Sequence, residues 1–285
     1  MKILIGYNGS EASAAALNEL RYAGLPDDIE ALILTVAESW GTPKTAEEAR
    51  RISAAGTAKV RELFPKWTVA GEIASGSPPR EILARSAAVD PDLIVVGEPR
   101  HNLSEHNMFM GRTSHVLLTE SKYSVRIARG GSNSPLHAER IIVGFDGSAG
   151  SMHAVESIAE RRWSAGSEVR LLAVADASVL GSIGRFTPQM TNAVVETKFA
   201  SQWAEALAAR SVESLKKAAI IPSVTVRLGD PKSVIIKEAS DWNADTIFVG
   251  PHCSPNSFER FLLGSVSAAV AAQAPCSVEV VRKSV

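Results

Sequence analysis

The sequence predicts an α/β protein built of two tandem, doubly wound, five-stranded parallel-sheet domains. Three observations support this prediction: the chain repeats itself, short apolar runs alternate with longer amphipathic stretches, and the runs are apolar on both faces. Strands buried on both faces are typical of a parallel sheet covered by helices. The alternation of strands and helices implies right-handed crossovers, and hence helices on both sides of each sheet.

The repeat appears when the chain is compared with itself. Residues 3–10 (ILIGYNGS) match residues 141–148 (IIVGFDGS) at an offset of 138 (141 − 3). From residue 76 onward the offset is 153 (229 − 76), so the second copy carries 15 extra residues (153 − 138) between Asp176 and Gly229. Ordered agreement of several blocks predicts a duplication, with domains at residues 1–130 and 138–285. The intervening GGSNSP at residues 130–135 has the composition of a flexible linker.

Each copy is expected to contain five strands in the same order along the chain. In the first copy these are residues 3–7, 31–37, 68–74, 93–97 and 124–128, and in the second 141–145, 169–175, 223–228, 246–250 and 278–281. The amphipathic stretches predict helices over 12–23, 45–63, 79–88 and 113–120 of the first copy. Pro79 and Pro231 stand early in their helices, where a missing N–H costs little.

Composition and charge exclude several classes of protein. The net charge of −1 gives no basic footprint for nucleic acid. The most apolar window, residues 261–281, is interrupted by Gly264, Gln273 and Pro275, so it does not predict a membrane span. Two cysteines are too few for a disulfide framework, and the N-terminal segment lacks a signal-peptide pattern. We therefore expect a reduced, cytoplasmic protein without membrane or nucleic-acid partners.

A ligand site is expected where strand order reverses, beyond the carboxyl ends of the strands. The first and fourth strands of each copy end at glycine-containing turns, and the fourth helix of each copy follows Gly111 or Gly264. Free N–H groups and the positive dipole end at a helix start favour a phosphate. The alternative is that each glycine only makes a tight turn. No phosphate-loop motif and no Gly-x-Gly-x-x-Gly pattern is present, which argues against an ordinary NTPase or dehydrogenase.

Several of these motifs resemble those of the universal stress protein family, and the resemblance covers nearly the whole chain. They are the Asp146-Gly147-Ser148 turn, the strands at 92–97 and 245–250, the GSVS segment at 264–267 and the APCSV segment at 274–278. The resemblance implies that two strands at the ends of the copies pair to form an internal pseudo-dimer with pseudo-two-fold symmetry. Two chains would then associate further as a homodimer.

ATP-binding members of that family carry Gly, two residues, Gly, nine residues, Gly, then Ser or Thr. Both copies depart from this pattern, because Cys253 and Arg100 replace the second glycine and Gly264 and Gly111 come one residue late. In the first copy Arg112 also replaces the hydroxyl residue, Asn8 replaces the aspartate, and Glu98 would place a carboxylate near a phosphate. The first pocket is therefore expected to be degenerate.

The second copy keeps more of the motif and is expected to bind ATP or a related adenine nucleotide, with or without Mg²⁺. Its candidate binding residues are Asp146, Gly147, Ser148, Val174, Gly250, Gly264, Ser265 and Val266. The weaker first site comprises Asn8, Gly9, Ser10, Val36, Gly97, Gly111 and Thr113. Val36 and Val174 match the position that the family places beside adenine, although a core role explains a valine there equally well.

The leading functional prediction is a stress-response protein that binds or senses ATP, ADP or AMP, with at most weak ATP hydrolysis and no assigned catalytic residue. The alternative is an interaction scaffold that binds no nucleotide and acts through an unknown protein partner. His101, His106 and His252 lie in equivalent loops, but their spacing is not a zinc pattern, so no metal site is predicted. The 15 extra residues suggest either a lid bearing Arg185 or Lys198, or a longer helix or surface loop.

Overall fold

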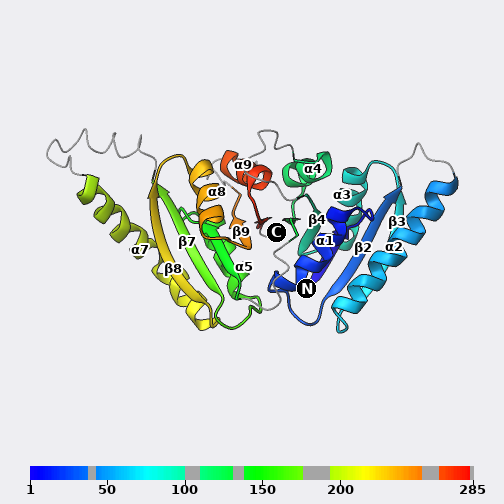
Figure 1. The fold of residues 1–285 in the computed structure, drawn as a ribbon, viewed down its shortest axis with the longest axis horizontal. Helices are drawn as coiled ribbons and strands as arrows, with labels where there is room; N and C mark the ends of the chain where they lie inside the picture. The colour runs from blue at the N-terminus through cyan, green and yellow to red at the C-terminus, as the bar shows by residue number, and fades with distance from the viewer. Residues whose placement is uncertain (38–42, 100–109, 131–137, 176–192, 252–262, 283–285) are drawn as a thin grey trace.

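The computed structural model describes residues 1–37, 43–99, 110–130, 138–175, 193–251 and 263–282. Side chains of residues 43–45 and 193–201 are not part of the description. The ten strands of these segments form one sheet in the order β3-β2-β1-β4-β5-β10-β9-β6-β7-β8 (Figure 1). The two halves of the chain thus share a sheet, and β3 and β8 form its outer edges.

In the first half, all five strands run parallel. They are β1 (Lys2–Gly6), β2 (Glu30–Ala37), β3 (Thr68–Ser75), β4 (Leu93–Gly97) and β5 (Ser124–Ala128). The helices are α1 (Glu11–Glu19), α2 (Pro43–Leu63), α3 (Pro78–Val89) and α4 (Arg112–Glu120). The predicted helix over 12–23 is divided, because α1 ends at Glu19 and a 3₁₀ turn, Leu20–Tyr22, follows it.

The second half repeats this arrangement, again with parallel strands. Its strands are β6 (Arg140–Gly144), β7 (Glu168–Ala175), β8 (Ile221–Leu228), β9 (Thr246–Val249) and β10 (Ser277–Val280). Its helices are α5 (Ala149–Ala159), α7 (Ala193–Lys217), α8 (Pro231–Asp241) and α9 (Ser265–Gln273). The described helices contain no segment long and apolar enough to cross a membrane.

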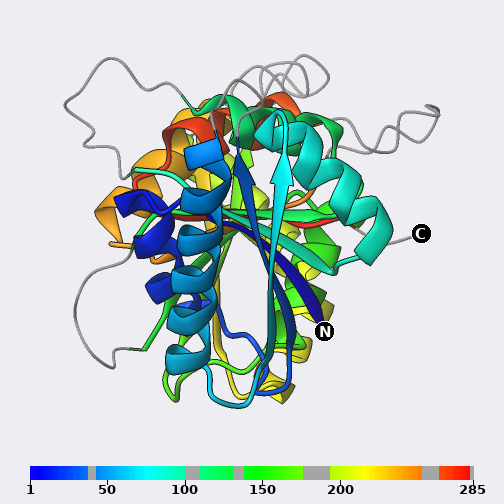
Figure 2. The same cartoon turned by 90° about the vertical axis from the view of Figure 1, so that its right-hand side faces the viewer.

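The halves join through an antiparallel pair, β5 with β10, centred on Arg126 opposite Glu279. Figure 2 shows how strongly the sheet twists between its edge and this junction. Two arginines cross the junction in equivalent ways. The guanidinium of Arg129 donates to the carbonyls of Ala271 and Cys276, and that of Arg282 donates to those of Leu118 and Tyr123. Arg282 is the equivalent of Arg129 in the second copy, 153 residues later, and the same offset relates the acceptors of the two arginines. The junction therefore has pseudo-two-fold symmetry.

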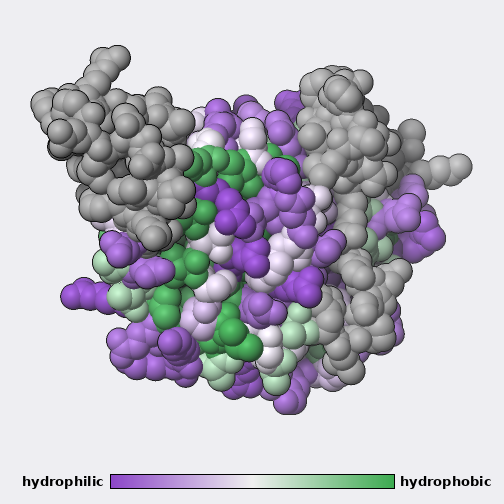
Figure 3. All heavy atoms as spheres, turned by 60° about the vertical axis from the view of Figure 1, so that its left-hand side comes forward, coloured by the Kyte–Doolittle hydropathy of each residue, from purple (hydrophilic) through white to green (hydrophobic). Residues whose placement is uncertain are grey.

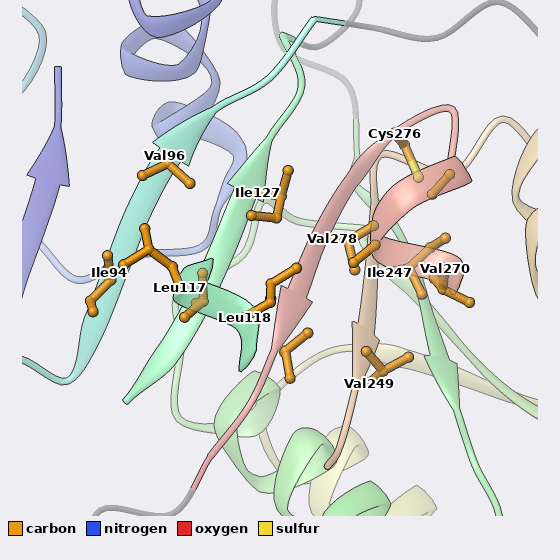
Figure 4. Close-up of a cluster of buried hydrophobic side chains, with 14 of the residues drawn as sticks. Ile94, Val96, Leu117, Leu118, Ile127, Ile247, Val249, Val270, Cys276 and Val278 are labelled. Atoms are coloured by element: carbon orange, nitrogen blue, oxygen red, sulfur yellow. The ribbon is translucent and has the colours of Figure 1, made fainter. Parts of the chain in front are cut away.

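One apolar core is continuous across the junction on the face covered by α3, α4, α8 and α9. Figure 4 shows Ile127 of β5 and Val278 of β10 between the side chains of α4 and α9. Cys276 is buried in this core. The opposite faces of the two halves are packed separately, under α1 and α2 in one half and under α5 and α7 in the other.

The opposite face of the junction carries a buried network of charges. Arg126 donates to both carboxylate oxygens of Glu19 on α1, to Glu279 at 3.2 Å and to the hydroxyl of Thr246 at 2.9 Å. Arg161, which follows α5, donates to both oxygens of Glu279. Burial disfavours the charged form of Arg126, but Glu19 and Glu279 outweigh that penalty and raise its pKa above the ordinary arginine value.

The extra length of the second half lies between β7 and β8. Helix α7 has 25 residues and α2 has 21, so part of the insertion lengthens a helix, as one of the two predicted alternatives requires. The proposed lid falls on residues 176–192, which lie outside the described residues, and the side chain of Lys198 is likewise undescribed. Figure 3 brings the α7 and β8 side forward and shows apolar side chains exposed among polar ones there; Ile221 and Leu228 of β8 are about half exposed.

Candidate functional site

The first and fourth strands of each half are neighbours, as the sequence predicts. Strand β1 pairs with β2 on one side and β4 on the other, so the order of the strands reverses at the β1–β4 pair. Strand β6 likewise lies between β7 and β9. The turns that leave these strand pairs therefore meet at one edge of the sheet, where α/β folds bind ligands.

The turn after β6 forms one wall of the second-half site. Gly147 adopts φ +73°, a left-handed conformation that favours glycine. The backbone N–H of Ser148 donates to Asp146 Oδ1 at 2.9 Å, and Ser148 Oγ accepts from Ser151 N–H at 3.2 Å, which caps α5. Asp146 and Ser148 therefore have structural roles in addition to any contact with a ligand.

The charge state of Asp146 follows from the same contacts. Burial opposes ionisation, but hydrogen bonds from Ser148 and Ser151 outweigh it and hold the pKa of Asp146 below its ordinary value. The carboxylate is therefore ionised at neutral pH, at the edge of the site.

The glycines that end the fourth strand are required by packing. A Cβ at Gly250 would collide with the backbone of Gly150 in α5, and a Cβ at Gly97 would lie 2.5 Å from the carbonyl oxygen of Ala12 in α1. At both positions the backbone of a helix packs where a side chain would otherwise lie. Close packing of a helix therefore explains why Gly97 and Gly250 carry no side chain.

The start of α9 forms the facing wall. Gly264 is the N-cap residue with φ −61° and ψ 152°, and the helix begins at Ser265. No described residue accepts a hydrogen bond from the N–H of Ser265 or Val266. The Ser267 hydroxyl donates to the carbonyl of Gly250 at 2.9 Å, which fixes α9 against the end of β9. The first turn of α9 thus presents N–H donors with no acceptor among the described residues, together with the positive end of its dipole.

A cavity of about 320 Å³ lies between these walls. Seven of the eight predicted residues line it: Asp146, Ser148, Val174, Gly250, Gly264, Ser265 and Val266. Gly147 shapes the turn without lining the cavity. The sequence analysis missed nine lining residues: Gly144, Phe145, Ser151, Leu172, Pro231, Ile235, Val249, Pro251 and Ser267. The repeat gave a signal for Pro231 and Ile235, since both match residues of the first copy, but their position could be known only from the folded sheet.

The first half holds an equivalent cavity of about 310 Å³. Of the predicted residues, Asn8, Val36, Gly97, Gly111 and Thr113 line it. Gly9 and Ser10 do not: Gly9 makes the turn at φ +74°, and Ser10 caps α1 by accepting from Ser13 N–H. Glu98 also lines this cavity and is 7% exposed. Its carboxylate accepts hydrogen bonds from Gly111 N–H, at 3.1 Å, and from the Ser114 hydroxyl.

Among the described residues, no group of three His, Cys, Asp or Glu side chains is placed to hold a metal ion. His101, His106, His252, Cys253 and Arg100 lie outside the described residues.

The universal stress protein family model matches the chain twice, at residues 1–129 and 137–282. The chain belongs to the universal stress protein family. It is a tandem member, because two copies of the family domain follow one another.

Relatives agree with this assignment. A Staphylococcus aureus (strain USA300) universal stress protein is 46% identical over 65 residues, which are 22% of this chain and 39% of that protein. The chain thus spans about two-fifths of the length of the curated relatives it matches.

Solved structures share the whole fold. A universal stress protein from Archaeoglobus fulgidus has a TM-score of 0.65 at 20% identity, over 99% of this chain and 96% of that one. A functionally unknown protein from Pseudomonas aeruginosa PAO1 has a TM-score of 0.66 at 15% identity, over 99% and 92%. A family protein from Arabidopsis thaliana with AMP bound matches 47% of this chain and 96% of that one, at 18% identity and a TM-score of 0.34.

Proposed function

We propose that this tandem universal stress protein binds an adenine nucleotide in its second half and serves the stress response as a nucleotide sensor. The observation that carries the proposal is the start of α9, where Ser265 and Val266, whose N–H groups have no acceptor among the described residues, line the cavity beside the turn after β6. A helix N-terminus of this kind stabilises a phosphate through its donors and its dipole.

The remaining walls suit the rest of a nucleotide. Leu172, Val174, Ile235 and Val249 provide apolar surface, while Ser148 and Ser265 provide hydroxyl groups at the rim. A volume of about 320 Å³ lies within the range of pockets that hold small ligands, roughly 300–1,000 Å³. In this arrangement the phosphate lies against α9 and the base lies against the apolar strand residues, with Val174 in the position that the family resemblance assigns beside adenine.

A proline substitution at the start of α9 tests the proposal with little risk to the fold. Ser265→Pro removes one N–H from the phosphate site at the first helical position, where proline is well tolerated. The extended conformation of Gly264, with ψ 152°, is the one that a following proline requires. Arg112→Pro is the matched control, because Arg112 begins α4 after Gly111 in the same conformation, with φ −59° and ψ 149°.

Calorimetric titrations with AMP, ADP, ATP and cyclic AMP measure the outcome, with ATP tested in the presence and absence of Mg²⁺. We expect one site per chain. Ser265→Pro should weaken binding roughly tenfold or more, because a hydrogen bond to a charged group contributes about 1.5–3 kcal/mol. Arg112→Pro should leave the affinity unchanged. If the wild-type chain bound none of these nucleotides, the proposal would be wrong and a scaffold acting through protein partners would be favoured.

A further inference from the structure

The first-half cavity contains a carboxylate at the start of its fourth helix, where no described residue of the second half places one. Glu98 follows directly after β4, and its side chain turns to the start of α4 instead of to solvent. One oxygen, Oε1, accepts from both Gly111 N–H and Ser114 Oγ–H. A Cβ added to Gly111 would lie 2.6 Å from that same oxygen, so the carboxylate is in contact with the first turn of the helix. The chain therefore supplies its own anion at this helix N-terminus.

The described residues of the second half show the same elements with no carboxylate bonded at the start of α9. Position 98 corresponds to Pro251 (98 + 153), which has neither a charge nor a hydrogen-bonding side chain. Ser267, the equivalent of Ser114, donates to the carbonyl of Gly250, its own half's strand end. The equivalent of Gly111 is Gly264, and no described residue accepts from its N–H. The two cavities have similar volumes, about 310 and 320 Å³, but among the described residues only the first has a carboxylate against the start of its helix.

The carboxylate of Glu98 faces hydrogen-bond donors and a helix dipole. The two donors and the positive end of the α4 dipole all face the carboxylate. Arg129, a buried junction residue, lies close enough for Glu98 to stabilise its charge: burial lowers the pKa of Arg129, and Cys276 and Glu98 oppose that decrease. A phosphate entering this cavity would therefore meet the Glu98 carboxylate at the start of α4, where the Gly111 N–H and the Ser114 hydroxyl already have an acceptor.

We propose that Glu98 is an internal anion that occupies the phosphate subsite of the first half and closes that cavity to phosphate-bearing ligands. This inference goes beyond the proposed function, because it concerns the other half and holds whether or not the second half binds a nucleotide. It makes the two halves unequal in a defined way, with one cavity closed by the chain itself.

Substitutions at the two equivalent positions, Glu98 and Pro251, test this proposal in the full-length chain. In Glu98→Ala, inorganic phosphate and AMP should shift the amide resonances of Gly111 and Ser114 in ¹⁵N-edited NMR spectra, whereas the same additions should leave these resonances unmoved in the wild type. We expect the affinity at this cavity to rise at least about tenfold, since a unit charge within a few ångströms of a phosphate is strongly repulsive. Glu81→Ala is the matched control, because it removes a half-buried carboxylate from the same half without touching α4.

Pro251→Glu provides a readout that needs no ligand. A carboxylate at position 251 should move the Gly264 amide proton downfield, to a position like that of Gly111 in the wild type, and should abolish any phosphate response at Gly264. The proposal is overturned if folded Glu98→Ala shows no phosphate response at Gly111, if Glu81→Ala responds equally, or if the Gly264 resonance does not move in Pro251→Glu. Failure of the second-half nucleotide site would appear separately, as an unresponsive Gly264 in the wild type.

Discussion

Removal of Arg126 from the junction of the two halves should destabilise the whole chain. Arg126 is fully buried and makes four hydrogen bonds, two of them to Glu19, whose side chain is only 4% exposed. In Arg126→Met the carboxylate of Glu19 loses its only described ion-pair partner, while Glu279 keeps Arg161. Leaving one buried charge uncompensated costs about 3–5 kcal/mol.

Urea unfolding at neutral pH measures this free energy of unfolding. Arg162→Met is the matched control, since Arg162 also joins the halves, at 2.9 Å from Asp27, but both side chains are more than half exposed. It should cost less than about 1 kcal/mol, as surface ion pairs usually do. The double variant Glu19→Met with Arg126→Met should recover at least about 1 kcal/mol of the loss, because no unpaired carboxylate remains at Glu19. The reasoning is refuted if Arg126→Met costs no more than Arg162→Met, or if the double variant is less stable than Arg126→Met.

Three further outcomes follow from the turn after β6. Ser148→Ala removes the cap of α5 and should cost about 1 kcal/mol in urea unfolding, and an unchanged midpoint would show that the Ser151 N–H finds another acceptor. Gly147→Val forces a branched side chain into φ +73° and against Leu207, and should cost about 2–3 kcal/mol, whereas a smaller loss would mean that the turn relaxes. The lowered pKa of Asp146 stabilises the fold above the ordinary aspartate pKa, and this contribution is lost as the pH falls through the folded value. Asp146→Asn should therefore lower the urea midpoint at about pH 6 more than at about pH 3, and equal decreases at both values would contradict that sign.

The strands could be predicted closely from the sequence because each is a short run buried on both faces. Leu93–Gly97 and Ser124–Ala128 have the predicted bounds, and β1 is displaced by one residue from the prediction. The end of α1 could not be predicted from the sequence, because Leu20 and Ala23 continue the apolar pattern through the 3₁₀ turn. Local periodicity does not distinguish an α-helical turn from a 3₁₀ turn.

Features that depend on distant partners could not be obtained from local patterns. Pairing of β5 with β10 was expected only through the family resemblance, and the charged network behind it was not foreseen, because Glu19 and Glu279 meet Arg126 from opposite ends of the chain. The repeat placed Ile235 in register with Ile82, but only the folded sheet brings it to the cavity.

In the candidate site, too, local motifs could be predicted from the sequence, whereas contacts between distant residues could not. The turn residues and the start of the fourth helix follow from glycine and hydroxyl positions, and the structure brings them to one cavity in each half. Gly97 and Gly250 were predicted for ligand approach, but the helix that packs against each of them is what excludes a side chain there. The carboxylate of Glu98 was noted as a charge near the first site, and its bonds to Gly111 and Ser114 became apparent only in the structure.

A crystal structure of the full-length chain grown with AMP or ATP tests the central claim most directly. The account predicts one nucleotide per chain, in the second half, with phosphate oxygens within hydrogen-bonding distance of the N–H groups of Ser265 and Val266 and the base beside Val174. The first-half cavity should hold no phosphate, because Glu98 remains bonded to Gly111. A nucleotide in the first half, or an empty second half at saturating nucleotide, would contradict the account.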